Sequence, residues 1–471
     1  MSEKPSSMQE DYSGWYNRVI REANLIKESP TRGVWTLMPR SNRIWNTIRH
    51  GMTEGMNAIG VNEVTMPTLF PMSLLEQEAE HVDGFAPEVF TVTKAGSKEL
   101  EDPLVVRPTS EVVVSELMRD EIESYRDLPY MINQWTSAFR AEKRPRPFLR
   151  TTEFLWQEGH SAHATPEDAD EHARRMAEFY KQFMEDELSL AAIPGEKSDN
   201  ERFPGAVATY ALEGQFGGRA LQLATSHNLG NNFALSHNIV FSDQDGALKP
   251  VYQTSWGSTT RLIGALVMGH GDDGGIVLPP QIAPEQVTVI PAWRNEEDRS
   301  VVDDFSHRIA ANLGSRAVVA RRELGDRLGA VRYATERTGS PLQLIVGQRE
   351  IDSNTASYKL RHSGETGTLN LDTLDTEAPR LLGRVASELL QSSREKQVAA
   401  MVFENGGIDK VVEAVEAGKM VVAGWAGDAQ AEQRLKDETG ITIRIHPDGY
   451  EDGRDPLTGE SGRAAIFAKS Y

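Results

Sequence analysis

Apolar residues recur at helical spacing in two segments near the start of the chain, residues 15–26 and 44–56. Intervals of three and four place these residues on one side of a helix, so each segment is predicted to be an amphipathic helix. Gly60 interrupts the second pattern, and Pro67 ends a short candidate strand at 61–66. Further candidate strands lie at 104–107, 130–140, 149–158, 220–226 and 251–255. Their hairpin and helical connections predict an antiparallel sheet with helices packed on it.

The pattern changes after the Pro279-Pro280 pair, which predicts a domain boundary at residue 280. Downstream, strand and helix signals alternate as strand 287–290, helix 297–313, strand 317–320, helix 326–338 and strand 342–346. This alternation predicts a βαβ-type unit over residues 281–385. A third unit over 386–471 opens with a helical stretch and holds candidate strands at 419–423, 441–445 and 464–468. The fold class is therefore a multidomain chain of α+β and α/β units, the first over 1–280.

Composition is consistent with several packed cores. The chain has 471 residues, which at roughly 150 residues per domain suggests about three domains. Of these residues, 39% are hydrophobic and 25% charged, as is typical of domains with buried cores. No apolar run approaches the roughly 20 residues that cross a bilayer. The first residues lack the apolar core of a signal peptide and the arginines of a transit peptide. We therefore expect a cytoplasmic protein with no membrane partner.

Charge and cysteine content exclude several functions. The net charge is -20, from 50 basic and 70 acidic residues, which disfavours nucleic-acid binding through bulk charge. A nucleic acid would have to meet a local basic segment, and residues 138–150 carry five basic residues against Glu142. Considered alone, this run of basic residues is typical of a solvated loop. The chain has no cysteine, so thiolate nucleophiles, disulfides and cysteine-ligated zinc are all excluded.

Two neighbouring candidate strands carry an unusual mixture of side chains on one predicted face. Residues of equal parity in a strand point to the same side of the sheet. That face holds Gln134, Thr136, Ala138 and Arg140 on the first strand, and Arg150, Thr152, Phe154, Trp156, Glu158 and His160 on the second. A purely charged face would be solvated, but aromatic rings among the charges favour a binding floor for a zwitterion and a nucleotide.

A third segment, 251–270, reads as a strand that passes through Gly257 into the start of a helix. Thr259 and Thr260 are candidate caps, and Arg261 lies in the first helical turn. Free N–H groups and the helix dipole favour a phosphate at such a position. An ordinary capped helix with a surface arginine explains this segment equally well when it is considered alone.

In this order, the three segments resemble the signature motifs of class II aminoacyl-tRNA synthetases. The strings RPTSE at 107–111, RTTEFLWQEGH at 150–160 and TSHNLG at 225–230 resemble prolyl-tRNA synthetases of the archaeal and eukaryotic type. The resemblance covers nearly the whole chain. It implies a class II antiparallel sheet over 1–280, an anticodon-binding domain over 281–385 and a zinc-binding-like domain over 386–471.

The same resemblance implies the reaction. L-proline and ATP would form prolyl-adenylate and pyrophosphate, and the prolyl group would pass to the 3′ end of tRNA(Pro). The first motif, which ends at Pro67, forms the interface of a homodimer in that family. A hydrolase or dinucleotide enzyme would need a nucleophile elbow or a GxGxxG fingerprint, and neither occurs in the expected context.

Residue roles are likewise implied by the resemblance. Arg140 and Arg261 are the catalytic arginines. Proline is held by Thr109, Glu111, Arg140, Trp156, Glu158, His160, Phe203 and His227. ATP is held by Arg140, Arg150, Thr151, Gln222, Thr225, Thr259 and Arg261, and Gln222 also meets Mg²⁺ through ATP. Gln222 and Thr225 have opposite parity on a regular strand, so a β-bulge is required to bring both to one site.

The C-terminal unit departs from the family pattern. Ala426, Ala431, Asp455 and Thr458 occupy positions where relatives carry cysteine ligands, so no zinc is expected. In the central unit, the candidate RNA contacts are Arg321, Arg322, Arg327 and Arg332, which are equally consistent with solvated helix charges.

The sequence allows two alternative functions to be compared with this one. A threonyl-tRNA synthetase would read its amino acid through a cysteine-containing zinc pocket, which this chain cannot build. A synthetase-like RNA-binding protein without activity is the other alternative, and the presence of Arg140, Gln222 and Arg261 together argues against it.

Overall fold

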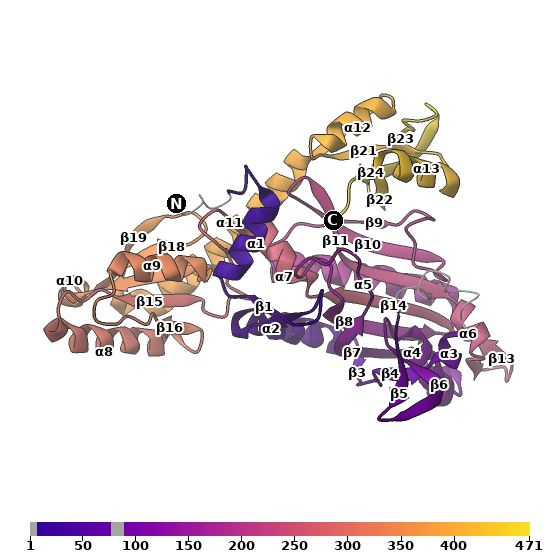
Figure 1. The fold of residues 1–471 in the computed structure, drawn as a ribbon, viewed down its shortest axis with the longest axis horizontal. Coiled ribbons are helices and arrows are strands. Elements are labelled where there is room, and N and C mark those ends of the chain that lie inside the picture. Colours follow the sequence, from indigo (N-terminus) through magenta and orange to yellow (C-terminus); the bar gives the residue numbers. More distant parts are fainter. Residues whose placement is uncertain (1–6, 77–88) are drawn as a thin grey trace.

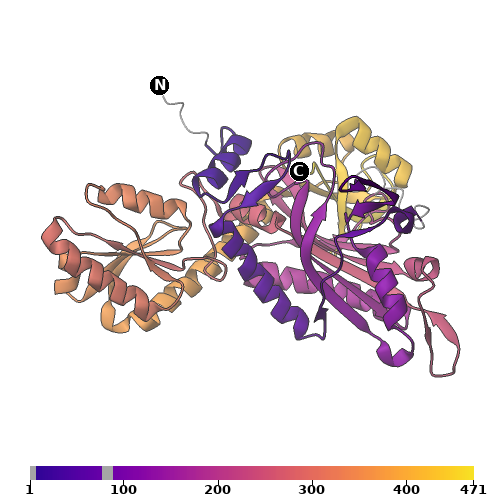
Figure 2. The same cartoon turned by 60° about the horizontal axis from the view of Figure 1, so that its bottom comes forward.

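A computed structural model describes residues 7–76 and 89–471. Figure 1 shows a broad sheet with helices packed on it, a separate α/β unit in orange and a smaller unit in yellow. The same three bodies are visible after rotation in Figure 2, where the α/β unit stands at one side and α11 leads from it. Over the described residues, the order of elements follows the predicted succession of one antiparallel sheet and two α/β-containing units.

The main sheet is antiparallel through its centre, as predicted. Its strands in the first unit follow the order β9-β10-β11-β14-β8-β7-β3, and among these described strands only the edge pair β3–β7 is parallel. The bounds are β3 Asn62–Glu63, β7 Tyr130–Phe139, β8 Glu153–His163, β9 Ile193–Glu196, β10 Ala208–Phe216, β11 Arg219–Gly230 and β14 Tyr252–Thr259.

Helices cover this sheet. They are α1 Tyr12–Glu22, α2 Pro39–Asn57, α4 Glu111–Glu121, α5 Pro166–Asp186 and α7 Arg261–His270. Helices α1, α2, α5 and α7 enclose the largest core, and α4 packs in smaller cores beside it. Trp15, Tyr180 and Trp256 are almost fully buried in the largest core. The indole of Trp256 lies so close to Gly159 of β8 that a Cβ there would meet it at 2.0 Å. Gly159 therefore lets the core pack directly beneath Glu158 and His160.

Smaller elements complete the first unit. They are β1 Ile26–Glu28 with β2 Trp35–Leu37, β4 Leu69–Pro71 with β5 Phe90–Ala95 and β6 Lys98–Val106, β12 Val240–Ser242 with β13 Leu248–Pro250, and helices α3 Met72–Glu76 and α6 Asn232–Ser236.

Two predicted boundaries in the first unit were wrong for local reasons. The helix over 15–26 ends at Glu22, because Asn24 takes a left-handed φ of 49° and turns the chain, so Ile26 begins β1. The strand over 149–158 starts only at Glu153. Phe148, with a φ of 61°, lies in a tight turn that precedes it. Arg150 and Thr152 therefore precede the regular alternation of β8.

The second unit is the predicted α/β fold. Parallel strands β15, β16 and β17 pair at its centre and antiparallel β18 and β19 extend it. Its elements are β15 Val287–Pro291, α8 Glu296–Leu313, β16 Ala317–Val319, α9 Leu328–Arg337, β17 Leu342–Val346, α10 Gln348–Asp352, β18 Thr355–Leu360 and β19 Thr366–Asn370.

One long helix, α11 Leu374–Ala400, joins the second unit to the third and runs continuously through residue 385. Figure 1 shows it lying along the first unit on its way. Lys396 donates to the Gly269 carbonyl at the end of α7 at 2.8 Å, and Arg394 pairs with Glu185 of α5 at 2.6 Å. This helix therefore contacts all three units.

The third unit adds its own strands to the main sheet. Strand β22 pairs with β9 through His446↔Glu196 and Pro447↔Gly195, which makes one continuous twelve-stranded sheet of the described residues. Its elements are β20 Met401–Phe403, α12 Ile408–Glu416, β21 Met420–Trp425, α13 Ala429–Thr439, β22 Thr442–Pro447, β23 Gly453–Arg454 and β24 Ser461–Ala468. Side chains of the third unit are thereby brought close to the centre of the first.

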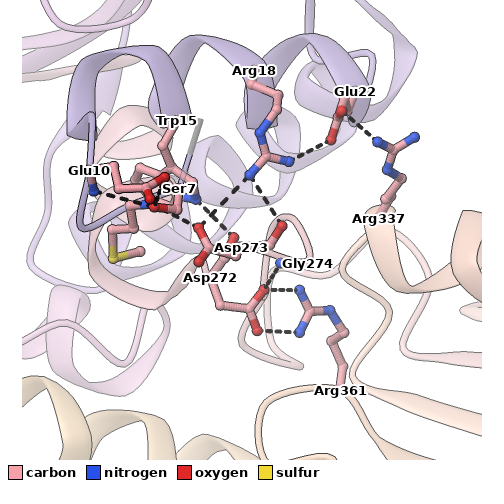
Figure 3. Close-up of polar contacts among 11 residues, drawn as sticks. Ser7, Glu10, Trp15, Arg18, Glu22, Asp272, Asp273, Gly274, Arg337 and Arg361 are labelled. Carbon is pink, nitrogen blue, oxygen red and sulfur yellow. Dashed lines mark hydrogen bonds and ion pairs between the residues drawn. The ribbon is translucent and has the colours of Figure 1, made fainter. Parts of the chain in front are cut away.

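Ion pairs link the second unit to the first (Figure 3). Arg361 donates to both carboxylate oxygens of Asp272 at 2.7 and 2.6 Å, and Trp15 donates to the Asp272 carbonyl at 2.9 Å. Glu22 of α1 meets Arg18 at 3.0 Å and Arg337 at 2.5 Å. Helix α1 and the loop after α7 therefore hold the α/β unit at a defined position.

Candidate active site

A cavity of about 510 Å³ opens on the main sheet, lined by residues of β8, β10, β11 and β14 and by the segment that follows β7. Its lining includes every predicted site residue except His160: Thr109, Glu111, Arg140, Arg150, Thr151, Trp156, Glu158, Phe203, Gln222, Thr225, His227, Thr259 and Arg261. His160 is buried just behind it, with Nε2 3.3 Å from Glu158 Oε1. The fold thus gathers residues separated by up to 152 positions along the chain, from Thr109 to Arg261.

One end of the cavity contains two buried carboxylates, Glu111 and Glu158. The Thr109 hydroxyl hydrogen-bonds Glu111 Oε2 and lies 3.1 Å from Glu158 Oε1. Glu158 also accepts from the Ser110 backbone N–H at 2.8 Å and from the Gln134 amide at 3.0 Å. Both carboxylates are therefore oriented by a dense hydrogen-bond network before any ligand binds.

Arg107 holds this network in place from below, a role that the sequence did not indicate. Its guanidinium is buried and donates to the carbonyls of Ser137, Met66 and Pro67 at 2.8 to 3.0 Å. The segment that follows it begins α4 at Glu111. Arg107 therefore ties the start of α4 to β7, whereas the sequence indicated it only as the first residue of the RPTSE string, with no role of its own.

The two carboxylates differ in their tendency to ionise. Burial raises the pKa of Glu111, and the neighbouring Glu158 charge raises it further. Burial also opposes ionisation of Glu158, but the hydrogen bonds and charge of His160 and the Ser110 contacts outweigh it and lower its pKa. Burial of His160 is in turn outweighed by Glu158, so the His160 pKa is raised. His160 and the buried Arg107 guanidinium thus favour the ionised form of Glu158, whereas a further cation beside Glu111 would favour its ionised form.

Aromatic side chains and Arg140 form the middle of the cavity, on the face that strand parity predicted. The Phe154 and Trp156 rings meet edge to face at 5.7 Å. The Arg140 guanidinium lies 5.4 and 5.8 Å from their ring centres, and its Nε donates to the Pro108 carbonyl at 3.1 Å. Arg140 is therefore held between the carboxylate end and the rest of the cavity by cation–π contact and a hydrogen bond.

The other end of the cavity is built around Arg261 at the start of α7. Its side chain donates to the Leu149 carbonyl at 3.2 Å and to the Gln222 carbonyl at 2.9 Å. Thr259 precedes the N-cap Thr260 and accepts from the Arg261 backbone N–H at 3.0 Å, whereas the Thr260 side chain makes no capping bond. Burial lowers the pKa of Arg261 to about 10, which leaves it charged at neutral pH.

The β-bulge required by the parity of Gln222 and Thr225 is present. Leu212 pairs with Ala224 while the next residue, Glu213, pairs with Gln222, so Leu223 is the extra residue. This insertion brings both Gln222 and Thr225 to the cavity. The β-bulge therefore explains how Gln222 and Thr225, which have opposite parity in the sequence, both reach the cavity.

A buried charge cluster beneath the bulge had no sequence signal. Glu213 is fully buried, and its Oε1 lies 2.7 Å from Lys197 Nζ and 2.9 Å from an Arg444 nitrogen. Arg444 belongs to β22 of the third unit, more than two hundred residues away. Its proximity depends on the strand pairing of β22 with β9, which no local pattern predicts.

The second unit carries the arginines that were predicted as candidate RNA contacts. Arg322 lies 3.9 Å above the Trp293 ring and donates to the Pro291 and Trp293 carbonyls at 3.0 Å, so it supports the fold of its own domain. Arg321 has an 88% exposed side chain and pairs with Glu323 at 2.9 Å.

In the third unit, the buried carboxylate of Asp455 organises its loop. Its carboxylate accepts from the backbone N–H groups of Ala426 at 2.8 Å, Leu457 at 2.7 Å and Thr458 at 3.2 Å. The side chains of Ala426 and Ala431 carry no ligand atom, and the described residues contain no cluster of three His, Asp or Glu that would hold a metal ion. The donor set at this loop does not fit zinc.

Matches to known families agree with this geometry. Residues 90–270 match the class II tRNA synthetase core domain for G, H, P, S and T, and residues 286–380 match an anticodon binding domain. Residues 408–471 match the C-terminal domain of prolyl-tRNA synthetase. The antiparallel sheet, with one arginine after β7 and another at the start of α7, defines a class II aminoacyl-tRNA synthetase.

Comparison with related sequences identifies the family within the class II aminoacyl-tRNA synthetases. The chain is 40% identical to a proline–tRNA ligase of Rubrobacter xylanophilus over 100% of this chain and 99% of that one. It is 39% identical to the ligase of Cenarchaeum symbiosum over 99% of both. The chain belongs to the prolyl-tRNA synthetases, the enzymes that use ATP to join proline to tRNA.

Solved structures of that family share the whole fold. Prolyl-tRNA synthetase of Cryptosporidium parvum complexed with L-proline and AMP has a TM-score of 0.91 at 32% identity, covering 99% of this chain and 96% of that one. The same enzyme complexed with halofuginone and AMPPNP has a TM-score of 0.92 at 33% identity, with the same coverage. Among the described residues, no helix is long and apolar enough to cross a membrane.

The raised pKa of His160 predicts a specific pH dependence of stability. A folded pKa above the ordinary 6.5 gives a stabilisation that is complete below that pH and is lost as pH rises through the folded value. Urea unfolding should therefore show a larger loss of unfolding free energy from about pH 6 to about pH 9 in the wild type than in His160→Gln. Exposed His50 is the control, and His50→Gln should keep the wild-type slope. Equal slopes in wild type and His160→Gln would contradict the buried ion pair.

Proposed function

We propose that the cavity forms prolyl-adenylate from L-proline and ATP, with proline at the Glu111–Glu158 end and ATP at the Arg261 end. The observation that supports this division is the charge at the first end, where a further cation beside the buried carboxylate of Glu111 would favour its ionised form. The secondary ammonium of proline supplies such a positive charge and two N–H donors. Binding of proline then stabilises the ionised form of Glu111.

The proline ring lies in an apolar slot in this proposal. Trp156 and Phe203 form its walls, and His227 packs against Phe203 with ring centres 4.6 Å apart. Flat rings suit a pyrrolidine ring, whereas Thr109 and Glu111 bind its nitrogen. His160 contributes from behind by keeping Glu158 ionised.

At the other end, the triphosphate is bound by charge and by helix geometry. Arg261 and Thr259 stand at the start of α7, where N–H groups favour phosphate. Arg150, Thr151, Gln222 and Thr225 complete the nucleotide site. The Gln222 amide oxygen is a hard donor of the kind that Mg²⁺ accepts together with phosphate oxygens. Mg²⁺ would neutralise phosphate charge there, and omission of Mg²⁺ from the assay tests its requirement.

Arg140 lies between the two substrates and contributes most to catalysis in this proposal. The proline carboxylate attacks the α-phosphorus and pyrophosphate leaves, so no general base is needed. A guanidinium beside both groups orients them and stabilises the charge that develops at phosphorus. Its cation–π and carbonyl contacts preorganise it for that position.

The acceptor in the second step is tRNA(Pro). The match of residues 286–380 to an anticodon binding domain supports anticodon recognition there, within a proposed division into units 1–280, 281–385 and 386–471. Footprinting with tRNA should protect exposed residues of the α/β unit, including Arg321. Protection confined to the catalytic unit would contradict this assignment.

We further propose a cytoplasmic homodimer. The short parallel edge strand β3 is followed by Pro67, the position of the family's dimer motif, which leaves that edge of the sheet for a second copy. Sedimentation velocity at micromolar concentration should give a dimer, and a monomer would contradict the assembly. Fractionation of cells should find the protein with cytoplasmic tRNA, and recovery in another compartment would contradict the location.

Replacement of Arg140 tests the proposed chemistry. Arg140→Ala should reduce proline-dependent ATP–pyrophosphate exchange by about 10²–10³-fold, because one preorganised donor at the transferring phosphorus is lost. The folded state should persist, as judged by thermal unfolding. Arg126→Ala, in an exposed 3-10 helix and outside the cavity lining, is the matched control and should retain activity. Near-normal exchange in folded Arg140→Ala would remove this residue from the mechanism.

The third unit is proposed to fold without zinc, because Asp455 satisfies the loop N–H groups that a metal site would otherwise order. Dialysis against a chelator should leave the unfolding temperature unchanged, and elemental analysis should find no stoichiometric zinc. Asp455→Ala should lower the unfolding free energy by about 1–3 kcal/mol, since buried donors lose their acceptor. The same change at exposed Asp437 should have little effect. One zinc per chain after extensive dialysis would refute the proposal.

A further inference from the structure

Thr209 lines the cavity, yet no motif in the sequence pointed to it. It lies on β10 directly opposite His227 of β11 and is only 2% exposed. Within the described chain, its hydroxyl has two hydrogen-bond partners. The Phe203 backbone N–H donates to it at 3.1 Å, and its oxygen lies 2.9 Å from His227 Nδ1.

These two contacts determine where the hydroxyl proton goes. A threonine hydroxyl has one proton and can accept two hydrogen bonds. The Phe203 N–H occupies one acceptor position, so the proton needs an acceptor of its own. His227 Nδ1 is the acceptor within reach, and a buried hydroxyl proton without a partner would be costly. The arrangement that satisfies this proton within the described chain has Nδ1 unprotonated and the ring proton on Nε2.

The ionisation of His227 is consistent with this tautomer. Burial lowers its pKa to about 3, and the nearby His160 and Arg140 charges contribute in the same direction. The imidazole is therefore neutral at working pH and has one N–H. Because Nδ1 is occupied by Thr209, the N–H that the ring offers to the cavity is Nε2–H.

We propose that Thr209 is a positioning residue for proline recognition, which fixes His227 in the Nε2–H tautomer so that the ring donates a hydrogen bond to the proline carboxylate. This inference rests on the proposed function, which puts proline beside His227. Zwitterionic proline has donors only on its nitrogen and acceptors only on its carboxylate. A donor on His227 therefore has one proline group to bind. With the carboxylates of Glu111 and Glu158 on the nitrogen, this donor completes recognition of both charged ends.

The same hydroxyl also orders the apolar wall. Phe203 precedes β10, and its backbone N–H is held by Thr209 while its ring packs against His227. One side chain thus sets both the tautomer of the histidine and the position of the aromatic ring that it contacts. Loss of the hydroxyl should affect proline more than ATP, because ATP is placed at the opposite end of the cavity.

The test uses Thr209→Val, which keeps the shape and removes the hydroxyl, and Thr209→Ser, which keeps the hydroxyl. Long-range ¹H–¹⁵N spectra of the full-length, ligand-free enzyme with labelled histidine report the tautomer, and His227→Gln assigns the signals. The wild type and Thr209→Ser should show Nε2–H alone, and Thr209→Val should show a population with Nδ1–H. Thr254→Val removes a buried hydroxyl that bonds Ser161 on the same sheet and should leave the His227 signals unchanged.

Exchange kinetics link the tautomer to proline. Thr209→Val should raise the KM for proline by about tenfold, as expected for a weakened hydrogen bond to a charged group, with little change in the KM for ATP. Thr209→Ser should restore the wild-type KM. An unaltered tautomer in Thr209→Val, an unaltered proline KM, or a Thr209→Ser variant as impaired as Thr209→Val would each overturn the proposal. Wild-type enzyme without proline-dependent exchange would instead refute the proposed function, and the spectra would still report the tautomer.

Discussion

A carboxylate that is buried in the main sheet needs cations or hydrogen-bond donors beside it. This constraint determines how the elements around the cavity are placed. Glu158 is buried to 2% exposure and is matched by His160, Gln134 and the N–H of Ser110. Glu213 is fully buried and is matched by Lys197 and Arg444. An unmatched charge at either place would be strongly destabilising. The strands and helix ends that carry these partners are therefore held in one arrangement.

That constraint also explains why a chain of three units behaves as one structure around its cavity. Arg444 reaches Glu213 only because β22 continues the main sheet beyond β9. Helix α11 runs from the α/β unit to the third unit while binding Gly269 and Glu185 of the first. The Asp272–Arg361 pair fixes the α/β unit from the other side. The anticodon-binding unit is thus held in a fixed position relative to the cavity of the first unit.

The cavity combines two kinds of preorganisation along one sheet. At one end, hydrogen bonds and opposed pKa shifts prepare two carboxylates for a cation. At the other, Arg261 remains charged although it is buried, and it is held by the Leu149 and Gln222 carbonyls. Arg140 stands between them, held by the Phe154 and Trp156 rings and by the Pro108 carbonyl. These arginine side chains are thus held in place by contacts within the protein itself.

The sequence by itself determined the order of the units, the shared face of Phe154, Trp156 and Glu158, and the need for a bulge between Gln222 and Thr225. These follow from strand and helix periodicity, which is local and is written directly into residue spacing. Only the tertiary structure decided the pairing of Thr209 with His227, the Lys197–Glu213–Arg444 cluster and the support that Arg107 gives to α4. Each joins residues through strand register or helix packing over long separations, and no local pattern encodes such contacts. The early end of α1 and the late start of β8 likewise arose from single left-handed residues, Asn24 and Phe148, whose conformations depend on the surrounding fold.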